Sequence, residues 1–126
     1  MTSSEKAPGL TVAVTGPTGD IGCALLRALD DTPEVTRVLG MARSPFEPSE
    51  MGLSGKIEYL RGDITDPDSV DELVADAAVV VHLAFLIFGS QDETLHINVE
   101  GSRNVFLSAL NNNCKRIVRT WDNSNR

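Results

Sequence analysis

Three glycines near the start of the chain have the spacing of a turn that binds phosphate groups. They lie in Thr15-Gly16-Pro17-Thr18-Gly19-Asp20-Ile21-Gly22, between an apolar run and a stretch with helical periodicity. Gly16 permits a tight turn, Gly19 lets backbone approach a pyrophosphate, and Gly22 allows the helix to pack closely against the sheet. The helix N-terminus then faces the phosphates. A glycine turn without a ligand is the alternative, but the strand and helix around the motif favour a dinucleotide site.

The end of the second apolar run bears on which dinucleotide this site prefers. An acid about 20 residues beyond the glycines would bind the ribose 2′-hydroxyl of NAD. Residues 39–44 read Leu-Gly-Met-Ala-Arg-Ser and contain no carboxylate. Arg43 is instead placed to meet the 2′-phosphate of NADP, with Ser44 as a second donor. We therefore expect NADP in preference to NAD, and the alternative is a solvated surface arginine.

Apolar runs alternate with amphipathic stretches in an order that predicts the elements around this site. The expected strands are residues 10–14, 35–42, 56–60, 79–83 and 116–119, and the expected helices are residues 21–29, 66–75 and 92–110. Asp66 and Pro67 mark a helix start, because Asp caps free N–H groups and Pro fits the first turn. Residues 44–55, rich in Pro, Ser and Gly, predict a surface loop. The pattern predicts a doubly wound, parallel α/β sheet of Rossmann type, incomplete, with about five strands.

Composition and charge exclude several classes of partner. The chain has 126 residues, of which 41% are hydrophobic, and a net charge of −7. Its basic residues are scattered, so we expect no nucleic-acid partner. The longest apolar stretch, residues 77–88, is too short to span a bilayer, and no signal-peptide core precedes the first strand, so we expect no membrane partner and a cytoplasmic location. Cys23 and Cys114 have no metal-type spacing and are expected to be reduced thiols.

Four segments together resemble the N-terminal part of the extended short-chain dehydrogenase/reductase family, the NAD-dependent epimerases and dehydratases. The Thr-Gly-x-x-Gly-x-x-Gly spacing matches residues 15–22, and residues 62–66, 81–84 and 98–105 match later family segments in the same order. The resemblance implies that the dinucleotide contacts the residues of these segments. The expected cofactor-binding residues are Gly16, Thr18, Gly19, Asp20, Ile21, Gly22, Arg43, Asp63, Ile64, Leu83, Ala84 and Asn98.

Some of these residues also have structural interpretations. In the family, the acid at the position of Asp63 and the apolar residue after it hold the adenine, but Asp is also a common turn-capping residue. Asn98 lies inside a predicted helix, where Asn has poor propensity, which hints that its side chain fixes neighbouring backbone. Gly101 costs that helix about 1 kcal/mol relative to Ala and indicates close packing. His82 and His96 lack further ligands and are expected to be structural, so no metal site is predicted.

The resemblance also implies a catalytic pair that the sequence lacks. In the family, hydride transfer is assisted by Tyr-x-x-x-Lys, in which the lysine cation lowers the pKa of the tyrosine. The only tyrosine is Tyr59, in a predicted strand, and aspartate stands four residues later. We therefore expect no catalytic residue in the chain and no oxidoreductase activity from this chain alone.

The expected organisation is a flexible N-terminus over residues 1–9, a truncated dinucleotide-binding domain over 10–120 and a polar tail over 121–126. A piece of a longer enzyme is favoured over a complete small protein, because a sheet that ends at its fifth strand leaves apolar surface uncovered. For the longer enzyme, the resemblance implies an NAD(P)-dependent epimerase, dehydratase or reductase that acts on a sugar nucleotide or small carbonyl compound. A non-catalytic dinucleotide-binding sensor or regulatory module is the alternative.

Overall fold

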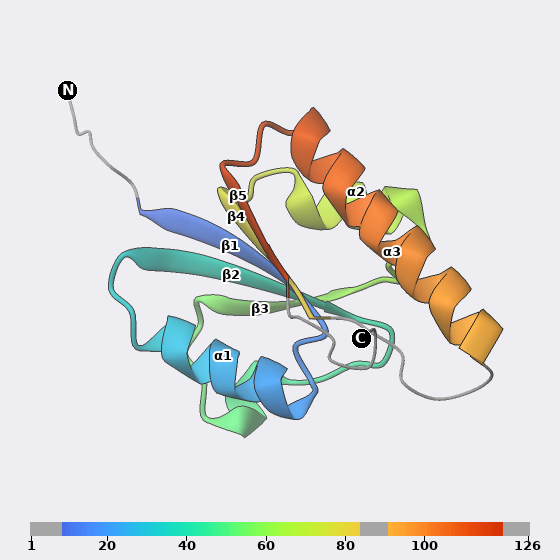
Figure 1. The fold of residues 1–126 in the computed structure, drawn as a ribbon. Helices are drawn as coiled ribbons and strands as arrows, with labels where there is room; N and C mark the ends of the chain where they lie inside the picture. The colour runs from blue at the N-terminus through green and yellow to red at the C-terminus, as the bar shows by residue number, and fades with distance from the viewer. Residues whose placement is uncertain (1–8, 84–90, 120–126) are drawn as a thin grey trace.

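The computed structural model describes residues 9–83 and 91–119. Within these residues, five parallel strands form one sheet in the order β3-β2-β1-β4-β5 (Figure 1). The strands are β1 (Leu10–Thr15), β2 (Val35–Ala42), β3 (Ile57–Arg61), β4 (Val79–His82) and β5 (Arg116–Arg119). The chain moves outward from β1 to β3 and then crosses to the other side of β1, so the prediction of a doubly wound parallel sheet is confirmed.

Helices cover both faces of this sheet, and the alternation of side chains along the strands explains why. The helices are α1 (Asp20–Asp30), α2 (Pro67–Val74) and α3 (Gln91–Asn111), with a 3-10 helix η1 (Pro48–Met51). Val12 and Val14 pack in the core cluster that contains Leu26 of α1, whereas Ala13 between them packs in the cluster under α2 and α3. Figure 1 shows α1 on one side of the sheet and the other two helices on the opposite side. Both faces of β1 are therefore buried, as its uninterrupted apolar sequence requires.

The expected surface loop after β2 is mostly exposed, but it contains a short helix and two buried residues that its composition did not predict. Residues 44–55 contain η1, whose Pro48 is buried, and Leu53 is only 8% exposed. Leu53 belongs to the core cluster that includes Ile57 at the start of β3. This segment covers part of the sheet face on the α1 side, where Phe46 and Met51 are also partly buried, even though Pro, Ser and Gly dominate its composition.

The start of α2 follows the expected capping pattern. Asp66 has extended backbone, and its Oδ1 accepts a hydrogen bond from the backbone N of Asp68 at 3.2 Å. Its Oδ2 accepts one from the hydroxyl of Ser69 at 2.9 Å. Pro67 occupies the first turn, where a backbone N–H would have no acceptor within the helix, so the N–H that proline lacks costs no hydrogen bond. None of the helices in the described residues is long and apolar enough to cross a membrane.

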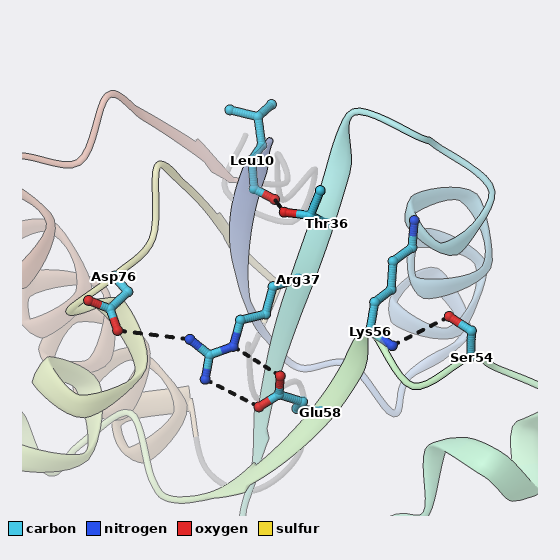
Figure 2. Close-up of polar contacts among 7 residues, drawn as sticks. All are labelled: Leu10, Thr36, Arg37, Ser54, Lys56, Glu58 and Asp76. Atoms are coloured by element: carbon cyan, nitrogen blue, oxygen red, sulfur yellow. Dashed lines mark hydrogen bonds and ion pairs between the residues drawn. The ribbon is translucent and has the colours of Figure 1, made fainter. Parts of the chain in front are cut away.

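An ion-pair cluster links β2, β3 and the turn after α2 close to the amino ends of the strands (Figure 2). The guanidinium of Arg37 donates to the Glu58 carboxylate through Nε at 2.9 Å and through a terminal nitrogen at 3.2 Å. Another terminal nitrogen lies 3.8 Å from Asp76 Oδ2. The hydrogen bond and charge of Glu58 raise the pKa of Arg37, a shift that burial opposes and Asp76 adds to. Arg37 therefore stays charged across the pH range in which the fold is studied.

We expect Arg37→Met to lower the free energy of unfolding by less than about 1 kcal/mol, because solvent screens such half-exposed pairs. The Arg37 and Glu58 side chains are 41% and 43% exposed. Urea unfolding followed by circular dichroism measures the change, and 1 M salt should shrink the difference between wild type and variant. A loss above 2 kcal/mol that salt does not reduce would contradict this assignment.

Candidate functional site

A pocket of about 300 Å³ opens at the carboxyl edge of the sheet. Residues at or just beyond the carboxyl ends of β1, β2, β3 and β4 line it, together with one residue of α3. The lining residues are Gly16, Thr18, Gly19, Met41, Ala42, Arg43, Gly62, Asp63, Ile64, Leu83 and Ile97. β1 and β4 are neighbours in the sheet, but the chain after β1 leads to α1 on one face and the chain after β4 leads to α3 on the other. The pocket lies at the carboxyl ends of these two strands, which is where doubly wound folds bind ligands.

The turn that joins β1 to α1 favours glycine at two positions, at Gly16 for its backbone conformation and at Gly22 for lack of space. Gly16 has a φ of +72°, a left-handed conformation that supports the expected tight turn. A Cβ atom on Gly22 would overlap the carbonyl oxygen of Gly16 and lie 2.7 Å from Pro17 Cα. Gly22 is therefore required by the turn itself, which differs from the expectation that it allows the helix to approach the sheet.

The N-terminus of α1 lies at this turn. Gly19 is its N-cap residue and has no side chain to cap the helix. The first hydrogen bond of the helix runs from the backbone N of Cys23 to the carbonyl oxygen of Gly19 at 2.8 Å. The amides of the first turn, from Asp20 to Gly22, precede that donor and have no acceptor within the helix. This end of α1 therefore offers N–H groups and positive dipole potential to an anion at the pocket.

Arg43 is an exposed cation at the rim of the pocket. It follows β2 directly and lines the pocket, and it makes no ion pair or hydrogen bond with the described residues. Ser44 beside it is also exposed but does not line the pocket. The arrangement leaves the guanidinium available to an anionic ligand.

Asp63 has one carboxylate oxygen engaged in a turn. Its Oδ1 accepts from both the backbone N and the hydroxyl of Thr65, each at 2.9 Å. Its Oδ2 makes no hydrogen bond with the described residues. The turn-capping interpretation of Asp63 is therefore confirmed, and the second oxygen leaves room for a ligand contact as well.

Close packing of α3 against the pocket wall holds Ile64 in place. A Cβ atom on Gly101 would overlap Ile64 Cδ1 and lie 2.8 Å from its Cγ1, which confirms the expected close packing at this glycine. Asn104, one turn further along α3, donates from Nδ2 to the carbonyl oxygen of Ile64 at 2.8 Å. Asn104 was not among the expected site residues, although it carries the same signal as Asn98, an Asn inside a helix.

The structure brings together seven of the twelve expected cofactor-binding residues as pocket lining: Gly16, Thr18, Gly19, Arg43, Asp63, Ile64 and Leu83. Asp20, Ile21 and Gly22 lie in the first turn of α1 outside the lining, and Asn98 is half-buried on α3 beside the lining residue Ile97. Ala84 lies outside the described residues. Four further lining residues, Met41, Ala42, Gly62 and Ile97, were not expected, although Ala42 and Gly62 immediately precede the expected Arg43 and Asp63.

Tyr59, His82 and His96 are not among the residues that line the pocket. Tyr59 on β3 packs edge-on against Phe46, with ring centroids 5.0 Å apart, and its buried hydroxyl has no hydrogen-bond partner among the described residues. His96 is exposed and lies 3.5 Å from Glu100, one turn away on α3. Within the part of the chain that the structure describes, no three His, Cys, Asp or Glu side chains gather as a metal site.

Most of the chain matches a known protein family. Residues 12–120 match the model of the NAD dependent epimerase/dehydratase family. Ceramide reductase of Caulobacter vibrioides is 37% identical over 93 residues, which cover 73% of this chain and 28% of the reductase. The chain spans about a third of the length of the first curated relatives that it matches.

Two solved structures have the same fold. Uronate dehydrogenase from Agrobacterium tumefaciens is 24% identical and superposes with a TM-score of 0.77 over 90% of this chain and 41% of the dehydrogenase. The Bordetella bronchiseptica enzyme WbmH, solved in complex with NAD⁺, is 26% identical with a TM-score of 0.71 over 86% of this chain and 38% of that enzyme.

Proposed function

The chain belongs to the NAD-dependent epimerase/dehydratase family, and from that premise we propose that residues 10–120 form the dinucleotide-binding portion of an NAD(P)-dependent epimerase, dehydratase or reductase. The observation that carries the proposal is the pocket at the carboxyl edge, where the glycine turn and the start of α1 meet. A bound nicotinamide group would supply hydride transfer, and the longer enzyme would act on a sugar nucleotide or small carbonyl compound.

The chemistry of the pocket residues suits the parts of a dinucleotide. The diphosphate would lie on the turn between Gly16 and Gly19, because amide N–H groups of α1 point to that side. Adenine would pack against Ile64 and donate its amino hydrogen to Asp63 Oδ2, the oxygen that Thr65 does not use. The remaining lining residues are mostly apolar, as expected for a site that holds a flat ring.

The charge at the end of β2 supports NADP as the preferred cofactor. Arg43 is the only residue among the described pocket lining with a positive charge, and no described carboxylate neutralises it. An arginine fork binds a phosphate through two parallel hydrogen bonds, whereas the 2′-hydroxyl of NAD offers no charge to it.

We expect wild-type protein to bind NADPH about tenfold more tightly than NADH, because a hydrogen bond to a charged group contributes about 1.5 kcal/mol or more. Arg43→Asp should reverse the preference, since aspartate accepts from the 2′-hydroxyl and repels the phosphate. Isothermal titration calorimetry with both dinucleotides measures the ratio.

Arg27→Asp is the matched control, because it makes the same charge change on an exposed residue in the last turn of α1, away from the pocket. Its dinucleotide ratio should equal that of wild type. Binding of neither dinucleotide at millimolar concentration would refute the proposed function. An Arg43→Asp ratio equal to the control would refute only the 2′-phosphate assignment.

A further inference from the structure

We propose that His82 is a positioning residue that fixes the relative placement of three walls of the pocket without touching the ligand. This inference rests on the proposed dinucleotide function and deepens it. His82 is the last residue of β4, and it is 0% exposed. Its ring connects a strand on one side and a helix on the other, through contacts that are far apart in the sequence.

The imidazole reaches both neighbours through its two ring nitrogens. Nδ1 lies 2.7 Å from the hydroxyl oxygen of Thr15 at the end of β1, and Thr15 is also fully buried. Nε2 lies 3.0 Å from the hydroxyl oxygen of Ser102 on α3. A hydroxyl can donate or accept, so both contacts form with either neutral tautomer of the histidine. One side chain therefore ties β1, β4 and α3 together.

Each of the tied residues is next to a segment that lines the pocket. Thr15 directly precedes Gly16 of the phosphate turn, and its hydroxyl oxygen also accepts a hydrogen bond from the backbone N of Leu83 at 2.9 Å. Leu83, a lining residue, directly follows His82. Ser102 follows Gly101, which packs on Ile64, and lies little more than one turn beyond the lining residue Ile97.

The contact with Thr15 is effective for positioning because both side chains are fully buried, whereas Ser102 is half-buried. Water does not compete with hydrogen bonds around a fully buried ring, so their lengths constrain the backbone on either side. An apolar side chain of similar size could fill the space but would not hold these distances. Small displacements of a binding wall are costly to affinity, because the ligand contacts on several walls must form at the same time.

The test compares two nearly isosteric replacements in the 126-residue chain. His82→Asn retains a polar group near the position of Nδ1, whereas His82→Leu fills the same volume without one. We expect His82→Leu, which loses both contacts, to weaken binding of NADPH about tenfold. His82→Asn keeps the contact with Thr15 and loses the one with Ser102, so it should weaken binding about threefold, as Ser102→Ala should. The affinities are measured by calorimetry at a temperature at which circular dichroism shows every variant to be folded.

A second pair separates positioning from general destabilisation. Ser102→Ala removes the half-buried hydroxyl that contacts His82, and Ser108→Ala removes a more buried hydroxyl on the same helix. Ser108 is 3% exposed and donates to Asp71 Oδ1 at 2.6 Å, a contact between α3 and α2 that touches no lining residue. Both variants should lower the melting temperature, but only Ser102→Ala should weaken NADPH binding.

Amide hydrogen exchange in the ligand-free protein keeps this test separate from the proposed function. We expect the Leu83 amide to exchange about tenfold faster in His82→Leu and to be unchanged in Ser108→Ala. If wild type binds no dinucleotide, the proposed function fails, and this exchange difference alone decides the role of His82. Equal Leu83 exchange in the two variants, or equal affinities in the Asn and Leu variants, overturns the inference.

Discussion

Gly22→Ala is expected to lower the free energy of unfolding by about 3 kcal/mol and to weaken dinucleotide binding at least about tenfold. The added methyl would overlap the carbonyl oxygen of Gly16 and approach Pro17 Cα to 2.7 Å. Both neighbours are backbone atoms, so no side-chain rotation relieves the contact, and the phosphate turn must open. The helix propensity gained on replacing Gly by Ala, about 1 kcal/mol, offsets only part of this cost.

Two other glycines provide controls for this prediction. Gly55→Ala adds a methyl with no atom within 4 Å, so stability and binding should stay close to wild type. A methyl on Gly19 would be 4.0 Å from the nearest atom, the Gly16 oxygen, but it would enter the pocket lining. Gly19→Ala should therefore weaken binding with little loss of stability. Urea unfolding and calorimetric titration measure the two effects, and a Gly22→Ala protein as stable as Gly55→Ala would contradict the overlap.

Gly101→Ala is expected to destabilise the protein by about 2 kcal/mol, the second largest effect, because the new methyl would overlap Ile64 Cδ1. The same substitution at an uncrowded helix position would stabilise by up to about 1 kcal/mol. Since Ile64 also lines the pocket, its displacement should weaken dinucleotide affinity along with stability.

A double-mutant cycle attributes this loss to one contact. Ile64→Val removes Cδ1 and by itself should cost about 1 kcal/mol. In the Ile64→Val background, Gly101→Ala should cost less than in wild type but still destabilise, because Val keeps the Cγ1 atom 2.8 Å from the new methyl. We therefore expect a coupling energy of about 1 kcal/mol. Denaturant unfolding of the four proteins gives the coupling. Additive losses would show that the methyl is accommodated elsewhere along α3.

The order of elements and the place of the site follow from local patterns in the sequence. Apolar runs of four to eight residues alternating with helical stretches predict a parallel sheet, because each crossover must bury one amphipathic face. The bounds of β2 and β5 agree with the expected ranges to the residue. Glycines after the first strand and Arg43 after the second lie at strand ends that parallel pairing brings to one edge, so the pocket could be located without coordinates.

Only the tertiary structure decided which atoms meet at that edge. His82 contacts Thr15 and Ser102, which are 67 and 20 residues away, and Gly22 is needed because of the turn that precedes it. Leu53 is buried although its segment has the composition of a surface loop. Periodicity and turn chemistry act over a few neighbouring residues and therefore determine elements and their order. Side-chain contacts depend on how the strands twist and where each helix crosses the sheet, and these are properties of the packed core as a whole.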